Sequence, residues 1–182
     1  MTRLVGISGS LRKGSYNTAL LRFIADELPD GTTLEIVSIG ELPLFNQDLE
    51  ASPPEAVVQF RNALRDADGV VIATPEYNHS VPGVLKNALD WASRPPGEGA
   101  INNKPVAILG ASPGGIGTAR AQAHLHNILV AFGNAIFPHP QVAVARAHEQ
   151  FADDGTLESE GTRQFLSGFT QKMAAWMDTQ HG

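Results

Sequence analysis

Hydroxyl, amide and guanidinium side chains are concentrated in residues 9–17, which follow an apolar run at residues 4–7 and precede a helical pattern. Four of these side chains can donate hydrogen bonds to a phosphate: Ser10, Arg12, Ser15 and Asn17. A helix that begins in this loop adds free backbone N–H groups and the positive end of its dipole. The loop is therefore predicted to bind phosphate, and its place between a strand and a helix favours this over an ordinary Ser-Gly turn.

A second segment, residues 74–83, combines two prolines with the aromatic and amide side chains of Tyr77 and Asn78. A flat heteroaromatic ring needs backbone N–H and C=O groups along its polar edge and a stiff wall beside it. Prolines restrict the backbone in a way that suits such a wall. A capped turn between a strand and a helix, with Tyr77 packed locally, explains the same residues equally well, so both interpretations stay open.

A third segment, residues 110–117, consists mostly of small residues, which allow a ligand to approach the backbone closely. A flexible loop without a ligand is an equally good explanation. The segment also satisfies the G-x-S-x-G pattern of a serine hydrolase. That activity is excluded because the residue after the nucleophile must donate its backbone N–H to the oxyanion, and Pro113 has none.

These segments need a scaffold that brings them together, and the sequence alternates between strand and helix patterns. Buried strands are predicted at residues 4–7, 34–39, 70–73 and 106–109, with a fifth at 135–137 or 142–144. Helices are predicted at residues 16–28, after a Ser-x-x-Glu capping box at 52–55, at 82–93, at 118–132 and around the apolar positions of 165–177.

This alternation predicts an α/β fold in which one domain, residues 1–182, forms a three-layer doubly wound sheet of five parallel strands. Ligands of such sheets bind beyond the carboxyl ends of the strands. The loops after strands one, three and four are the three segments described above, so we expect them to form one site.

The composition argues against several functions. The formal net charge of −6 disfavours nucleic acid as the main partner, because phosphate backbones attract clustered Lys and Arg. The sequence has no Cys, which excludes a thiol nucleophile, a disulfide framework and a Cys-held metal. His124 and His126 lie two apart on a helix and face different directions, so no metal site is expected. No signal peptide and no bilayer-crossing apolar stretch are visible, and we expect a cytoplasmic protein without a membrane partner.

Three sequence runs carry a resemblance to a known family: GSLRKGSYN at 9–17, TPEYNHSVPGVLKNALDWAS at 74–93 and ASPGGIGTARAQ at 111–122. Together they resemble the NADPH-dependent FMN reductase family, over about residues 4–145. The resemblance implies a flavodoxin-like fold with strand order 2-1-3-4-5.

The family's known site implies which residues contact FMN here. Its first loop holds the FMN phosphate, which implies Ser10, Arg12, Ser15 and Asn17. Its second loop borders the isoalloxazine ring, which implies Pro75, Glu76, Tyr77 and Asn78. Its third loop lies at the other edge of the ring, which implies Ser112, Gly114 and Gly115.

The resemblance also implies an enzyme that oxidises NAD(P)H and reduces small acceptors, such as quinones, flavins, nitro or azo compounds, or chromate. A hydride would pass to flavin N5, and the acceptor would then take the same face, in a ping-pong scheme that requires no catalytic residue from the protein. The alternative is a flavodoxin-type electron carrier that serves protein partners. The acidic charge fits a carrier, whereas Arg12 in the phosphate loop argues against one.

We expect a homodimer or a homotetramer. In the helix at 82–93, Trp91 projects off the apolar stripe by about one helical step of 100°. A large aromatic side chain there needs a cover, either a loop of the same chain, such as the one at 94–99, or a second subunit. The resemblance adds weight to a second subunit, because related reductases pair through this helix and through the helix after the Gly-rich loop.

Overall fold

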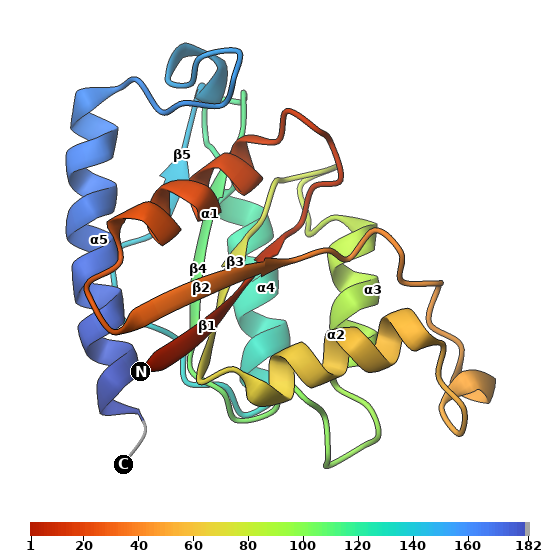
Figure 1. Cartoon of the computed structure of the whole chain (residues 1–182). Coiled ribbons are helices and arrows are strands. Elements are labelled where there is room, and N and C mark those ends of the chain that lie inside the picture. The colour runs from red at the N-terminus through yellow and green to blue at the C-terminus, as the bar shows by residue number, and fades with distance from the viewer. Residues whose placement is uncertain (181–182) are drawn as a thin grey trace.

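The computed structural model describes residues 1–180 and contains a five-stranded sheet in the order β2-β1-β3-β4-β5 (Figure 1). The strands are β1 (Thr2–Ser8), β2 (Thr32–Val37), β3 (Gly69–Ala73), β4 (Val106–Ala111) and β5 (Val142–Val144). The helices are α1 (Tyr16–Glu27), α2 (Glu55–Asp66), α3 (Gly83–Ala92), α4 (Ala119–Ala131) and α5 (Glu160–Thr179). All neighbouring strands are parallel, which confirms the predicted flavodoxin-like α/β fold and its strand order.

Helices cover both faces of the sheet and make three layers (Figure 1). α1 and α5 pack on one face, and α2, α3 and α4 pack on the other. β3 is buried along its whole length. Because successive side chains of a strand point to opposite faces, Val70 and Ile72 pack toward α2 and α3, whereas Val71 and Ala73 pack toward α1 and α5. Burial on both faces explains why this strand is apolar throughout.

The capping box predicted at residues 52–55 is wrong. α2 begins at Glu55 after the N-cap residue Pro54, and no side chain caps it. The reason is the Pro-Pro pair. A residue that precedes a proline is driven out of the helical region, so Pro53 cannot form the first turn, and Pro54 itself is extended with φ of −55° and ψ of 150°. Ser52 therefore lies too far before the helix to cap it.

Of the two segments expected to supply the fifth strand, residues 142–144 do so. The other segment contributes an isolated parallel bridge between Ile136 and Val106. Pro138 and Pro140 lie between this bridge and β5, and proline has no N–H to donate to a strand ladder. The edge of the sheet is interrupted there.

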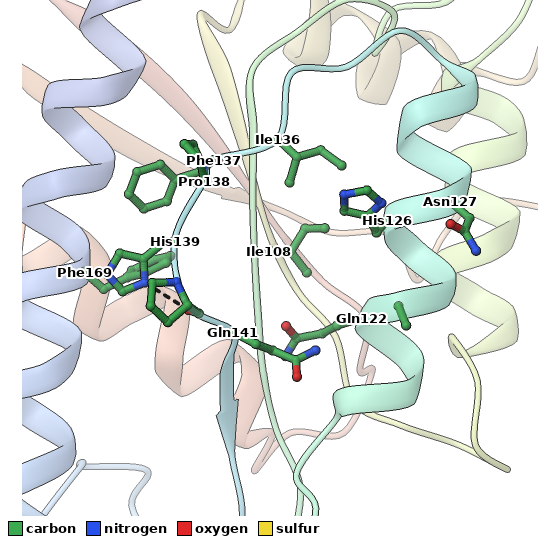
Figure 2. A pocket seen from close by; sticks show the side chains of 12 residues that line it. Ile108, Gln122, His126, Asn127, Ile136, Phe137, Pro138, His139, Gln141 and Phe169 are labelled. Atoms are coloured by element: carbon green, nitrogen blue, oxygen red, sulfur yellow. Dashed lines mark hydrogen bonds between the residues drawn. The ribbon is translucent and has the colours of Figure 1, made fainter.

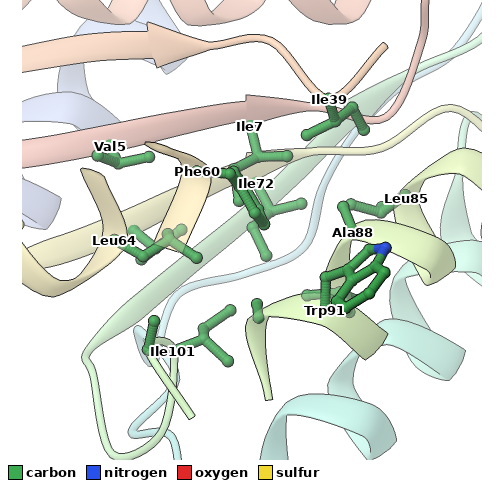
Figure 3. Close-up of a cluster of buried hydrophobic side chains, with 14 of the residues drawn as sticks. Val5, Ile7, Ile39, Phe60, Leu64, Ile72, Leu85, Ala88, Trp91 and Ile101 are labelled. Atoms are coloured by element: carbon green, nitrogen blue, oxygen red, sulfur yellow. The ribbon is translucent and has the colours of Figure 1, made fainter. Parts of the chain in front are cut away.

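Of the two covers expected for Trp91, a loop of the same chain and a second subunit, the structure shows a loop of the same chain, but it is not the loop at 94–99. Trp91 is 0% exposed and belongs to the cluster of buried side chains in Figure 3. Its ring packs edge-on against Phe45 with the centroids 4.9 Å apart. Its Nε1–H donates to the carbonyl of Pro43 at 2.8 Å. The cover is the connection between β2 and α2 in the same chain, so Trp91 gives no argument for a dimer.

Candidate cofactor site

The carboxyl ends of β1, β3 and β4 bring three loops to one edge of the sheet. A cavity of about 320 Å³ opens between these loops. Its walls are formed by Ser10, Arg12, Ser15, Tyr16, Asn17, Pro75, Glu76, Tyr77, Ala111, Ser112 and Pro113. Of the residues that the sequence suggested as cofactor contacts, Asn78, Gly114 and Gly115 lie outside this lining and the others belong to it.

The start of α1 presents hydrogen-bond donors to the cavity. Ser15 is the N-cap residue, and its Oγ accepts the N–H of Thr18 at 3.2 Å, which leaves the hydroxyl proton for a ligand. The backbone N–H groups of Tyr16 and Asn17 lie in the first turn, where a helix offers no acceptor. Ser10 adds a second hydroxyl, whose oxygen accepts the N–H of Arg12 at 3.4 Å. These donors match a phosphate.

Arg12 is the one Lys or Arg among the residues that line this cavity. The side chain is exposed, and its guanidinium carbon lies 4.9 Å from the centroid of the Tyr16 ring. Tyr16 in turn packs against Phe151 with the centroids 5.3 Å apart. Cation–π attraction to a supported aromatic ring therefore holds the charge of Arg12 beside the donor-rich end of the cavity.

Asn17 is engaged inside the fold. Its Nδ2–H donates to the carbonyl of Ala111 at 3.0 Å, and its Oδ1 accepts the N–H of Ala111 at 2.9 Å. The residue is 3% exposed. This pair of bonds joins the start of α1 to the end of β4, so a ligand can meet only the backbone N–H of Asn17 or its second amide hydrogen.

Residues 76–80 form a tight hairpin beside the cavity. Tyr77 and Ser80 exchange both backbone hydrogen bonds, at 3.1 and 3.0 Å. Asn78 and His79 between them have φ of 49° and 62°, the left-handed values of a type I′ turn. Asn and His are among the non-glycine residues that adopt this region most readily. The turn leaves Tyr77 51% exposed and places Asn78 at the tip.

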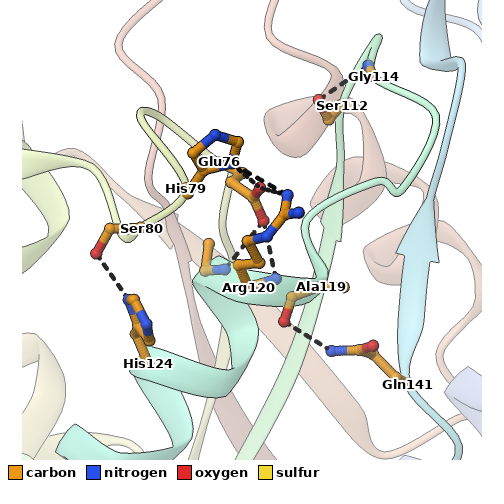
Figure 4. Close-up of polar contacts among 10 residues, drawn as sticks. Glu76, His79, Ser80, Ser112, Gly114, Ala119, Arg120, His124 and Gln141 are labelled. Carbon is orange, nitrogen blue, oxygen red and sulfur yellow. Dashed lines mark hydrogen bonds and ion pairs between the residues drawn. The ribbon is translucent and has the colours of Figure 1, made fainter.

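The carboxylate of Glu76 contacts the N-terminus of α4 (Figure 4). Its Oε2 accepts the backbone N–H of Arg120 at 2.9 Å and that of Ala121 at 3.1 Å, while Oε1 lies 3.5 Å from Arg120 Nη1. The side chain is 6% exposed. Burial by itself raises the pKa of Glu76, but the hydrogen bonds from Ala121 and Arg120 and the charge of Arg120 outweigh it, so the pKa is lowered. Glu76 is therefore ionised at neutral pH.

The glycines of the third loop serve two different purposes. A Cβ on Gly110 would lie 2.2 Å from a backbone oxygen, so close packing of strand and loop requires glycine there. Gly117 has a φ of +62°, and a Cβ would lie 2.7 Å from another backbone oxygen. Gly114 and Gly115 are exposed, and a Cβ on Gly115 would meet no atom within 4 Å. The sequence did not single out Gly110 and Gly117, because their neighbours come from other segments.

A larger cavity of about 590 Å³ lies between α4 and residues 136–141 (Figure 2). Its lining combines apolar side chains, such as Ile108 and Phe169, with neutral polar ones, such as Gln122. It contains no Lys or Arg and none of the expected cofactor residues. Without a Lys or Arg, this cavity offers a phosphate no permanent cation, so we do not assign the cofactor to it.

Residues 1–180 contain neither a cluster of metal-binding side chains nor a helix that could span a membrane. In this part of the chain, no group of three or more His, Asp or Glu side chains is arranged to hold a metal ion. His124 instead makes a hydrogen bond of 2.9 Å between its Nδ1 and Ser80 Oγ. None of the helices described is both long and apolar enough to cross a bilayer.

The donors and the shape of the smaller cavity fit FMN. The phosphate would meet Ser10, Ser15 and the start of α1, with Arg12 as the neutralising cation. The flat ring would then lie against the residues of the hairpin and of the third loop that line the same cavity. The sequence analysis missed Tyr16, which supports Arg12 and can be recognised only from the fold.

Comparisons with known proteins identify the family of this chain. The family of NADPH-dependent FMN reductases matches residues 2–149. The chain is 42% identical over 175 residues to the 2-hydroxy-1,4-benzoquinone reductase of a Burkholderia species, with 96% of each chain covered. It is 44% identical over 181 residues to an NAD(P)H-dependent FMN reductase of Pseudomonas aeruginosa, with 99% of this chain and 97% of that one covered.

Solved structures give the same result. FerB, a flavoenzyme NAD(P)H:(acceptor) oxidoreductase from Paracoccus denitrificans, superposes with a TM-score of 0.90 at 37% identity and covers 99% of both chains. An azoreductase from Bacillus anthracis, 21% identical with a TM-score of 0.62, shares the fold. The expected cofactor and reductant, FMN and NAD(P)H, are those of the family, and the expected enzyme class is confirmed. On its sequence, its fold and the chemistry of its cavity, the chain belongs to the NADPH-dependent FMN reductase family.

Proposed function

We propose that this protein is an NAD(P)H-dependent flavin enzyme that reduces quinones and related small acceptors. The observation that carries the proposal is the cavity at the carboxyl edge of the sheet, whose lining combines phosphate donors with residues of the hairpin and of the third loop. When bound, FMN supplies the redox chemistry by taking a hydride from NAD(P)H and releasing electrons to the acceptor. The names of two relatives, a 2-hydroxy-1,4-benzoquinone reductase and a quinone reductase, support quinones as the acceptor class.

The proposed contacts fall into three sets. The phosphate is held by the side chains of Ser10, Arg12 and Ser15 and by the remaining N–H groups of Asn17. One side of the ring is bordered by Pro75, Glu76, Tyr77 and Asn78, with Glu76 acting through its backbone because its carboxylate is engaged by α4. The other edge of the ring is bordered by Ser112, Gly114 and Gly115.

The role proposed for the protein is binding and orientation. Apart from tyrosines, the titratable side chains in the lining are Arg12 and Glu76. The guanidinium of an arginine does not act as a proton donor in proteins, and the carboxylate of Glu76 is hydrogen-bonded to α4. Neither of these two charged side chains is placed to supply a proton, which supports the proposal that binding and orientation are the main roles of the protein.

The test is to purify the protein, record its visible spectrum and follow NADPH and NADH oxidation against quinones, free flavin, nitro and azo compounds and chromate. We expect a flavin spectrum and quinone-dependent turnover without a partner protein. Absence of turnover with both reductants, together with electron delivery to a redox protein after chemical reduction, would instead establish a flavodoxin-type carrier.

We further propose that the single domain works in the cytoplasm as a homodimer or homotetramer. The absence of Cys is compatible with a reducing compartment. With Trp91 buried in its own chain, support for self-association moves to α4, where Val130 is 54% exposed. Light scattering on the FMN-loaded protein tests this, and a mass near 19.4 kDa would contradict it.

A further inference from the structure

α4 begins without a cap from its own sequence. Its N-cap residue, Thr118, makes no side-chain hydrogen bond to the first turn, and its Oγ1 accepts the Nε2–H of Gln122 at 2.8 Å instead. The first N–H groups of a helix lack intrahelical partners and carry the positive end of the dipole. Glu76, 44 residues before Arg120, fills this role by accepting the N–H groups of Arg120 and Ala121.

Further contacts hold the hairpin along the same helix (Figure 4). Ser80 Oγ lies 2.9 Å from Nδ1 of His124, one helical turn beyond Arg120. At the near end, Nδ1 of His79 lies 3.0 Å from Arg120 Nη1. The hairpin is thus attached to α4 at both of its ends, through Glu76 and through Ser80.

Glu76 makes the strongest of these contacts. It is ionised, 6% exposed and bonded to two N–H groups, and such charge-assisted bonds are about twice as strong as neutral ones. The side chain of Arg120 is 52% exposed, so solvent screens its attraction to Glu76. The Ser80–His124 contact is also exposed. The hairpin therefore depends mainly on Glu76 for its position against α4.

We propose that Glu76 is a positioning residue, which holds the hairpin on the N-terminus of α4 and thereby fixes the wall that borders the flavin ring. The inference rests on the proposed function, since Glu76 and Tyr77 both line the proposed FMN cavity. Without the carboxylate, the hairpin loses its main attachment to α4, and its position beside the flavin ring becomes less well fixed. The same carboxylate places a negative charge at this wall, which opposes the addition of electrons to a neighbouring ring.

The test uses Glu76→Gln, which keeps the shape of the side chain and removes its charge. Titration of apo protein should show FMN and riboflavin affinities that fall by the same factor, about tenfold, because the ring wall and not the phosphate end is altered. The midpoint potential of the bound flavin should rise, because a negative charge beside it is lost. The matched control is Glu98→Gln, an exposed carboxylate in the loop after α3, which should change neither quantity.

A second variant, Arg120→Gln, removes the exposed cation but keeps both backbone hydrogen bonds to Glu76. Its flavin affinity should stay near that of the native protein, and its midpoint potential should fall. If circular dichroism shows that Glu76→Gln is unfolded, Arg120→Gln becomes the test of the proposal. A midpoint potential equal to or above that of the native protein would then overturn the proposal.

If Glu76→Gln is folded, any one of three results also overturns the proposal. They are native affinity for both flavins, an unchanged midpoint potential, and a loss of affinity confined to FMN. The last would place Glu76 at the phosphate end. If Glu98→Gln changed flavin affinity and midpoint potential as much as Glu76→Gln does, the loss of any one negative charge would explain both effects. That result would also overturn the proposal. A native protein that binds neither flavin would contradict the proposed function itself, which separates the two failures.

Discussion

Arg12 and Glu76 are both charged residues in the lining of one cavity, yet they serve different ends. Arg12 is exposed and rests on the ring of Tyr16, so its guanidinium N–H groups can turn to a ligand. Glu76 is buried, and its oxygens are already bonded to α4. A side chain can serve a ligand only with hydrogen-bonding groups that the fold has left unused.

The first prediction concerns Arg12. Arg12→Ala should weaken FMN binding about ten- to a hundredfold, because a charge-assisted contact to phosphate contributes about 1.5–3 kcal/mol. Riboflavin, which has no phosphate, should bind as it does to the native protein. Fluorescence titration of both flavins measures this, and Lys172→Ala is the control, because Lys172 is an exposed cation on α5 that does not line the cavity. Equal losses for both flavins would refute the assignment.

The second prediction concerns Asn17. Asn17→Ala leaves the buried N–H and C=O of Ala111 without their partner, which should lower the free energy of unfolding by about 1–3 kcal/mol. Urea unfolding of the apo protein measures this effect without the cofactor. Asn127→Ala on the exposed side of α4 is the control. An unchanged unfolding midpoint in Asn17→Ala would show that the bridge between α1 and β4 is not stabilising.

At the scale of elements, the third loop contains two kinds of glycine: some are surrounded by tightly packed atoms, and others have open space beside them. Gly110→Ala should destabilise the fold by at least about 1–3 kcal/mol, because the added Cβ would lie 2.2 Å from a backbone oxygen that cannot move aside. Gly115→Ala meets no protein atom within 4 Å, so it should keep native stability and report only on contact with the cofactor. Thermal unfolding of the two apo variants compares them, and equal melting temperatures would contradict the packing argument.

The attachment of the hairpin to α4 should depend on pH. Because the pKa of Glu76 is lowered in the folded protein, its contribution to stability is fully present above the pKa that it has in the unfolded chain. The contribution is lost as the pH falls through the lower folded value, where the carboxylate becomes protonated. Glu76→Gln should therefore show a flatter fall of unfolding free energy in acid than the native protein. Parallel curves for the two proteins between neutral and acidic pH would argue against this.

At the scale of the whole molecule, the cavity of about 320 Å³ combines residues from all three loops at the carboxyl edge of the sheet, so both substrates are expected to use it in turn. Steady-state rates at several NADPH and quinone concentrations should then give parallel double-reciprocal lines. Flavin absorbance should also bleach when NADPH is added without an acceptor. Intersecting lines without bleaching would point to a ternary complex instead.

The sequence by itself was sufficient to predict the layered fold and the meeting of three loops at one edge of the sheet. Strand and helix patterns such as residues 70–73 and 118–132 arise from local hydrophobic periodicity, which depends on neighbours in the chain. In a parallel sheet, these patterns bring the loops after β1, β3 and β4 to one edge. The resemblance to flavin reductases supplied the strand order and the chemistry of the ligand.

Only the tertiary structure decided what the individual side chains do. Asn17 bonds to Ala111, 94 residues away, Glu76 to Arg120, 44 residues away, and Trp91 to Pro43, 48 residues away. A polar side chain buried on folding must find hydrogen-bond partners, and the partner it finds depends on which segments the fold places next to it. For this reason Asn17 and Glu76, which have the chemistry of ligand-binding residues in the sequence, use their side chains to hold the loops of the site together.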